Sequence, residues 1–289
     1  MVEKCVLMEA LILLCLRLPQ SIEVQRDLLK QLVSHVTSAW STPTPTSQST
    51  PMLRLLTTCA TGGSGLVSIL GLDQPISAHQ DFQSPYVQMR ITLGQNVLAL
   101  LATSRRLSEP ANSQQVFKRI HYLSFYHNNL FYLQQITVPL LEPVVSSVFV
   151  VVRAFNELWL PDTRALVDPS VLPAFEMTEH VKYTLLSLQI GRTDKRHLPE
   201  PKTPLERIRS SLYEHHENLL TIVGLLFTGL SPSLYHLPTD QLAMLLHQGC
   251  CAAFEHLPDL KLNSLLRILF IITLLWAFQF YPVDIAYYL

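Results

Sequence analysis

The stretch LNSLLRILFIITLLWAFQFY, residues 262–281, is nearly uniform in its apolar character and predicts a helix that ends at Pro282. Between Ile268 and Phe278 it contains one polar residue, Thr273. A helix that is apolar on all sides has to be covered by neighbouring helices or by lipid. The identity of this cover therefore decides the fold class.

Two segments directly upstream favour protein as the cover. Pro204–Gly229 and Thr239–Glu255 carry apolar residues at steps of three and four, which predicts two amphipathic helices. In the first of them the expected core positions are Leu205, Ile208, Leu212, Leu219, Ile222, Val223 and Leu226. The alternative is a membrane-anchored helical protein that spans at 262–281, because about 20 predominantly apolar residues suffice to cross a bilayer. A second apolar segment near 136–155 would then accompany it.

Composition indicates a helical protein inside the cell. Of the 289 residues 48% are hydrophobic and 15% are charged, well below the usual quarter, and there are only nine glycines. The net charge of −1 gives no global basic field of the kind that attracts nucleic acid non-specifically. Five cysteines with no framework spacing suggest reduced thiols.

The amino-terminal region predicts an αα-hairpin, the unit of helical solenoids. Val2–Arg17 and Ile22–Trp40 both show helical apolar spacing, and Pro19 separates them. The expected core positions are Leu7, Ala10, Leu11, Leu14, Cys15 and Leu18 in the first helix, and Val24, Leu28, Leu32, Val36 and Trp40 in the second. Together with the three helices at the other end, this hairpin predicts an all-α fold, a HEAT-like helical-hairpin solenoid.

The sequence divides into five parts by composition and apolar spacing. Within the second part, a short helix is expected at Met52–Cys59 and a turn at the glycine cluster Thr61–Gly65. In the third part, Val144–Phe155 has the β-branched content of a strand, but it has no partner strand and is interpreted as a helix. The predicted parts are a helical hairpin at 1–40, a Pro/Ser/Thr/Gly-rich loop region at 41–85, helical repeats at 86–190, a polar basic loop at 191–203 and helical repeats at 204–289.

The chain has no recognisable catalytic or metal-binding motif. The adjacent pair His215 and His216 has no second histidine four residues on, and neighbouring side chains on a helix point about 100° apart, so they would not chelate one ion. No phosphate loop, dinucleotide fingerprint or nucleophile elbow is present. The sequence therefore predicts a protein that is not an enzyme, with no catalytic residue, metal site or cofactor.

Two pairs of basic residues are the candidates for contact with RNA or phosphate. Arg105 and Arg106 lie near the end of a predicted helix, and Lys118 and Arg119 lie on an aromatic-rich one. Both pairs also fit a solvated helix face, where cations near a carboxyl-terminal end are favourable. On the inner wall of a solenoid they would line a groove for nucleic acid.

Five stretches resemble the pre-microRNA exportins of the importin-β superfamily. The similarity is greatest at 205–214 (LERIRSSLYE) and 254–270 (FEHLPDLKLNSLLRILF), and it continues into Tyr281 and Pro282. It is fair at 6–14 and 31–40 and weak at 96–102. No short motif defines these proteins, so the signal is a run of similar residues in the same order.

The resemblance implies a HEAT-repeat solenoid that shuttles between nucleus and cytoplasm. Its implied partners are Ran-GTP, double-stranded or hairpin RNA, and cargo proteins. Such exportins are several times longer than 289 residues, and this sequence resembles their middle. The repeats that bind Ran in these proteins have no counterpart here, so a fragment of a longer protein is expected.

Overall fold

The computed structural model describes residues 2–17, 21–41, 50–112, 138–176, 203–230 and 239–280. All regular structure in these ranges is helical, which confirms the predicted all-α fold; the HEAT superhelix itself stays a prediction. The long helices are α1 (Val2–Arg17), α2 (Ile22–Trp40), α5 (Pro85–Asn112), α8 (Val145–Glu157), α11 (Pro204–Gly229) and α14 (Asp259–Phe280). The shorter α-helices are α3 (Pro51–Cys59), α4 (Gly63–Leu70), α9 (Pro161–Arg164) and α13 (Thr239–Met244). The remaining elements are the 3-10 turns η1 (Ile76–His79), η2 (Glu142–Val144), η3 (Leu172–Phe175) and η6 (Phe254–His256), and the π-helical segment η5 (Leu245–Cys250).

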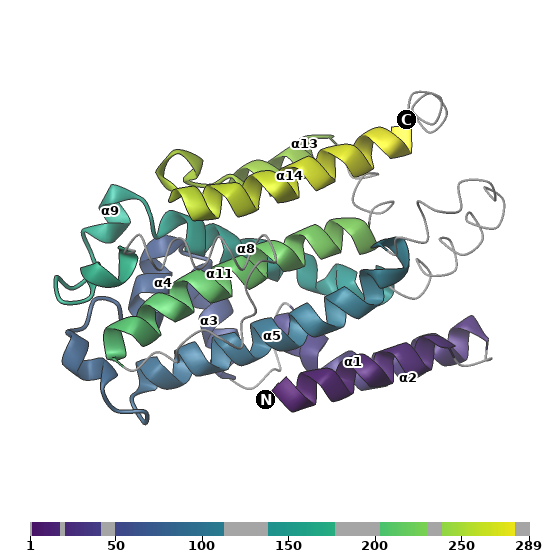
Figure 1. The fold of residues 1–289 in the computed structure, drawn as a ribbon, viewed down its shortest axis with the longest axis horizontal. Coiled ribbons are helices and arrows are strands. Elements are labelled where there is room, and N and C mark those ends of the chain that lie inside the picture. The colour runs from purple at the N-terminus through teal and green to yellow at the C-terminus, as the bar shows by residue number, and fades with distance from the viewer. Residues whose placement is uncertain are drawn as a thin grey trace.

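The helices are stacked side by side around a central pair (Figure 1). α5 and α11 run along each other through the middle of the molecule. The α1–α2 hairpin packs on the α5 side of this pair, and α14 packs on the α11 side. α8 contacts α3, α4, α11 and η5, so it joins the short helices to the carboxyl-terminal ones.

Side chains from one helix to the next fix the order of this stack. Arg106 of α5 pairs with Glu9 of α1, with Nη2 2.7 Å from Oε2. The indole nitrogen of Trp40 donates to the carbonyl of Asn96 at 3.3 Å, which ties α2 to α5. The Ser108 hydroxyl donates to the carbonyl of Leu225 at 2.9 Å, which ties α5 to α11. Partly buried bonds of this kind fix position more than they add stability, since each contributes only about 1 kcal/mol net.

The first two helices have the predicted bounds, but their buried faces differ from the prediction. In α1, Met8 and Ile12 are buried in the protein core, whereas Leu7 and Leu14 are each 61% exposed. α2 buries Leu29 and Val33 together with the predicted Val36 and Trp40, and it leaves Val24 and Leu28 exposed. α1 is apolar on almost every side, so apolar spacing alone does not select its inner face.

The β-branched segment is a helix, as interpreted from the absence of a partner strand. α8 buries Val148, Val151, Val152 and Phe155 at helical spacing. Valine in a helix is less favourable than alanine by only a few tenths of a kcal/mol, roughly, whereas burying one valine side chain gains about 1.5 kcal/mol or more. Burial therefore overrides local strand preference.

The loop-rich region predicted at 41–85 contains α3, which confirms the short helix expected at Met52–Cys59, and also α4 and η1, which were not predicted. Thr50 caps α3, because its side chain accepts a hydrogen bond from the backbone nitrogen of Leu53. The predicted turn at Thr61–Gly65 is wrong beyond Gly62, which has φ 84° and directly precedes α4. The next glycine lies against α8 rather than in a turn: the Gly63 nitrogen donates to Oε2 of Glu157 at 2.8 Å, and a Cβ at Gly63 would lie 2.8 Å from the backbone carbon of Glu157.

The Gly63→Ala variant is expected to unfold with a free energy about 2 kcal/mol lower than the parent chain, because overpacking against rigid backbone forces α4 and α8 apart. Gly224→Ala is the matched control. Its Cβ would meet Ile268 at 3.6 Å, an ordinary contact, so alanine there should stabilise α11 by up to about 1 kcal/mol. Urea unfolding followed by circular dichroism measures both. Equal effects of the two substitutions would contradict the close approach at Gly63.

The second of the three carboxyl-terminal helices is shorter than predicted. The α-helix α13 ends at Met244, and the π-helical segment η5 follows it to Cys250. Ala253, with φ 53°, is in the left-handed region and lies beyond the helix. The apolar core positions predicted for α11 are buried, with Leu205 half-buried. The third helix, α14, packs Leu265, Ile268 and Ile272 against the core.

Of the described segments, Val138–Glu157 is long and apolar enough to cross a membrane, with a mean hydropathy of 1.8. Within the protein, 61% of its most apolar window is buried, as expected for a core helix. The described side chains of α14 have one face covered by protein, while Leu266 and Phe270 are exposed. A span at 262–281 stays an alternative that these contacts do not require.

Candidate functional site

Of the four basic residues predicted to contact RNA, the structure describes Arg105 and Arg106. Arg105 is exposed on α5. Its neighbour Arg106 points to α1 and is held by Glu9, with Nε 2.9 Å and Nη2 2.7 Å from the same carboxylate oxygen. Lys118 and Arg119 lie outside the described residues.

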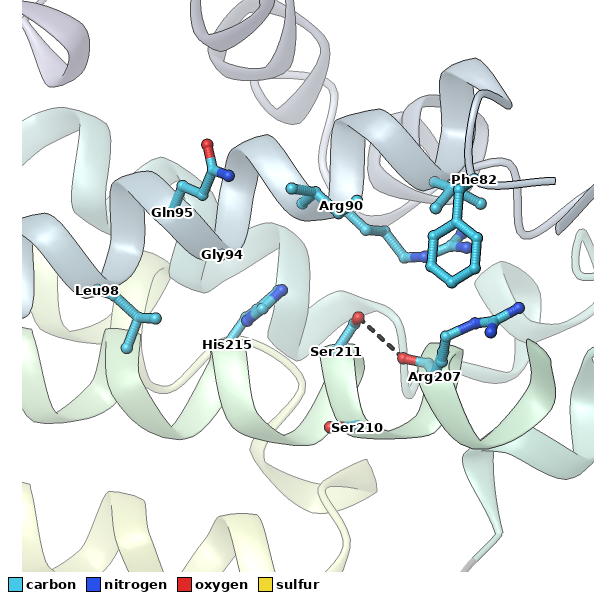
Figure 2. A pocket seen from close by; sticks show the side chains of 11 residues that line it. Phe82, Arg90, Gly94, Gln95, Leu98, Arg207, Ser210, Ser211 and His215 are labelled. Atoms are coloured by element: carbon cyan, nitrogen blue, oxygen red, sulfur yellow. Dashed lines mark hydrogen bonds between the residues drawn. The ribbon is translucent and has the colours of Figure 1, made fainter. Parts of the chain in front are cut away.

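A groove of about 360 Å³ lies between α5 and α11, the two central helices (Figure 2). Its α5 wall is mainly apolar and its α11 wall is polar and basic. The lining residues are Phe82, Val87, Arg90, Ile91, Gly94, Gln95 and Leu98 on the first side, and Arg207, Ser210, Ser211 and His215 on the second. Helical spacing explains the two walls, because residues three and four apart share one face.

Two arginines, Arg90 and Arg207, lie at the same end of the groove as Phe82 (Figure 2). Arg207 lies over the Phe82 ring, with its guanidinium carbon 4.7 Å from the ring centroid. Arg90 is only 4% exposed, and its Nη1 donates to the carbonyl of Leu70 and to Nδ1 of His79, both at 3.0 Å. Burial, and next the charge of Arg207, lower the pKa of Arg90 to about 10, so it stays protonated at neutral pH. The end of the groove therefore carries two positive charges.

His215 lies at the middle of the groove, opposite Gly94. A Cβ at Gly94 would be 2.6 Å from the His215 ring, so glycine is what lets the imidazole approach α5. Burial lowers the pKa of His215 to about 4, with smaller contributions from the charges of Arg90 and Lys261. The imidazole is neutral at pH 7 and contributes a hydrogen-bonding edge rather than a charge.

His215 is expected to make the protein less stable in mild acid. The unfolded chain takes up its proton near pH 6.5 and the folded chain only near pH 4. Stability is therefore lost as pH falls through this window, by about 3 kcal/mol in total. Comparing urea unfolding of the parent and of His215→Gln between these pH values measures the share of His215, since His216 titrates in both proteins. Parallel curves for the two proteins would contradict the lowered pKa.

A second polar cluster is buried between α8, α11 and η5. The Asn156 side chain donates from Nδ2 to the carbonyls of Gly249 and Cys250, at 3.2 and 2.8 Å. Its Oδ1 lies 2.7 Å from Nε2 of His216 and accepts the imidazole hydrogen. Burial holds the pKa of His216 well below its usual value, and the ring stacks on Phe155 with 5.5 Å between centroids. This neutral network holds the π-helical segment against the core.

Lys261 docks the beginning of α14 on α11. Its side chain is 1% exposed, its Nζ donates to the carbonyl of Tyr213, and it lies 5.0 Å from the centroid of the Tyr213 ring. One turn on, the Ser264 hydroxyl donates to Oε2 of Glu217 at 2.6 Å. Burial lowers the pKa of Lys261 to about 7, against the opposing charges of Glu217 and Glu214. The contact is structural, because it lies inside the helix interface.

The described residues contain no group of three His, Cys, Asp or Glu side chains that could hold a metal ion. Burial raises the pKa of the Cys59 thiol to about 12, and the pKa of Cys250 is raised mainly by burial and also by Cys251. These thiols are protonated and shielded at neutral pH, which disfavours both metal binding and nucleophilic chemistry.

The groove is a feature that sequence reasoning missed. Arg207 lies within one of the stretches that carry the resemblance, and the helical face shared by Arg207, Ser211 and His215 was readable from their spacing of four. Arg90 and Phe82 had no such signal, since their position depends on η1 and on the crossing of two helices 120 residues apart, roughly, in the chain.

Comparison with known proteins assigns the chain to a family. The sequence matches the Exportin-5 family over residues 1–276. Exportin-5 of Homo sapiens is 23% identical over 267 residues, and exportin-5 of Mus musculus is 24% identical over 268 residues. Each alignment covers 92% of this chain and 21% of the relative, so the chain spans about a fifth of the length of these curated relatives. Because the family match extends over nearly the whole sequence, this chain belongs to the Exportin-5 family.

Proposed function

We propose that this chain is a segment of a nuclear export receptor, a scaffold without chemistry that carries structured RNA and/or protein cargo together with Ran-GTP. The match to the Exportin-5 family over residues 1–276 is the observation that carries the proposal. The stack of long helices supports it, because helical arrays offer extended surfaces to large partners without needing a catalytic pocket. The expected location follows: such a receptor shuttles between nucleus and cytoplasm.

The proposed contacts with RNA phosphate are Arg105, Lys118 and Arg119, with Arg106 in a lesser role. Arg105 is exposed and α5 presents it to solvent. Arg106 would have to leave Glu9 to reach a phosphate, so its contribution should be smaller. A lysine or arginine that neutralises a phosphate releases a counterion. Removing one such residue should therefore make the slope of log binding constant against log salt concentration shallower by about one.

A retention experiment tests the proposal. The immobilised chain is mixed with a labelled RNA hairpin in the presence of Ran loaded with a non-hydrolysable GTP analogue, Ran loaded with GDP, or no Ran. The resemblance leaves the Ran-binding repeats without a counterpart in this sequence, so hairpin retention by the chain alone should be the same under all three conditions. A single strand of the same length is the matched RNA control, and we expect the hairpin to be retained roughly tenfold more than this strand. Equal retention of hairpin and single strand would count against a carrier function for this segment.

A further inference from the structure

The groove between α5 and α11 has two unlike walls that face each other. Val87, Ile91 and Leu98 form the apolar wall at helical spacing along α5. Arg207, Ser211 and His215 follow one another at steps of four along α11 and form the polar wall. An elongated ligand that is apolar along its length and polar at one end would match both walls.

Arg90 and Arg207 make one end of the groove positive, and the residues that line the groove include no carboxylate to pair with them. The guanidinium of Arg90 is bonded to two neutral acceptors, the carbonyl of Leu70 and the imidazole of His79. That of Arg207 stacks on Phe82, which is itself 57% exposed. Arginine presents a planar fork of donors that fits a carboxylate with two parallel hydrogen bonds. An anion at this end would satisfy both the charge and the open donors of Arg207.

The size of the groove fits a small molecule better than a nucleic acid. Its volume of about 360 Å³ is at the lower end of the range for sites that take small ligands. An RNA backbone would need a row of exposed cations, whereas one of the two arginines here is 4% exposed and the rest of the α5 wall is mainly apolar. Ile91 and Leu98 remain 39% and 37% exposed and would gain burial from an alkyl chain.

We propose that this groove binds a small amphipathic carboxylate, with its apolar chain along Ile91 and Leu98 and its carboxylate at Arg207. The site is independent of the proposed export function, because it needs neither RNA nor Ran. Arg90, fixed by its two neutral acceptors, holds the second positive charge behind Arg207 and strengthens the attraction for the anion.

Isothermal titration of the full 289-residue chain with octanoate at neutral pH and low ionic strength tests this site. Two comparators separate its parts: octanamide keeps the chain and lacks the charge, and acetate keeps the charge and lacks the chain. We expect octanoate to bind about tenfold more tightly than octanamide, as a charge-assisted pair at arginine implies, and acetate to give no measurable heat.

Variants assign the binding to the groove. Arg207→Gln should weaken octanoate about tenfold and change octanamide by less than about twofold. Ile91→Ser should weaken both, since it removes apolar wall. Arg54→Gln is the matched control, because it removes an exposed arginine of α3 that does not line the groove, and it should leave octanoate affinity within about twofold of the parent.

Thermal melts establish that each variant is folded. If Arg207→Gln is not, Arg207→Lys takes its place: it keeps the charge and loses the fork, so octanoate should weaken by roughly threefold while octanamide is unchanged. No heat with octanoate, equal affinity for octanoate and octanamide, or an unchanged affinity in the Arg207 variants would each overturn the proposal.

Discussion

The Asn156→Leu variant is expected to unfold with a free energy about 4 kcal/mol below that of the parent chain. Asn156 is fully buried on α8 and serves three partners: the carbonyls of Gly249 and Cys250 and the imidazole of His216. Leucine has a similar volume and no polar atom, so all three buried groups lose a hydrogen bond together. Each such loss costs about 1–3 kcal/mol, partly offset by the added apolar burial.

Urea unfolding followed by circular dichroism measures the loss, and two further variants show its origin. Asn96→Leu is the matched control, because the Asn96 amide bonds only to the carbonyl of Thr92 in its own helix and is not fully buried; a loss of less than about 1 kcal/mol is expected. Adding His216→Phe to Asn156→Leu should recover about 1 kcal/mol, since it removes one of the orphaned groups. An Asn156→Leu protein as stable as the Asn96→Leu protein would contradict the network.

Local patterns predicted which segments are helical better than which faces are buried. The stripe of α11 was read correctly because it is amphipathic, with charged residues such as Glu206 and Glu214 on the other side. α1 has apolar residues on almost every side, and the choice of Met8 and Ile12 over Leu7 and Leu14 is made by α5 and α2, which pack on it. Such a choice depends on contacts about 90 residues away in the chain and leaves no local signal.

The glycine cluster shows a second limit. Thr61–Gly65 has the composition of a turn, but Gly63 is there because α8 passes against it. Likewise η5 departs from α-helical geometry where Asn156 takes two of its carbonyls and Phe149 lies where a Cβ of Gly249 would be. In each case the contact comes from a residue about 90 positions away in the chain, and local propensity and turn signals do not report such contacts.

Raising the pH from 7 to about 8.5 is expected to stabilise the protein by about 1.5 kcal/mol through Lys261. Burial lowers the pKa of Lys261 from 10.5 to about 7. Between these values the unfolded chain holds a proton that the folded chain has released, so stability rises with pH across the window. From about pH 9 upward, the raised pKa values of Cys59, Cys250 and Tyr213 act in the opposite direction, because the unfolded chain then loses protons first.

The Lys261→Met variant should lose this rise and be about 2 kcal/mol more stable than the parent at pH 7, since an apolar side chain of similar length avoids the desolvation of an ammonium group. Lys30→Met on α2 makes the same chemical change at an exposed site and should keep the rise. Urea unfolding at several pH values in the window provides the comparison. If the stability of Lys261→Met still rises between pH 7 and 8.5, another titrating group is responsible for the rise. A strongly destabilised Lys261→Met would mean that the bond to the Tyr213 carbonyl outweighs the burial of the charge, and that α14 depends on Lys261 to stay on α11.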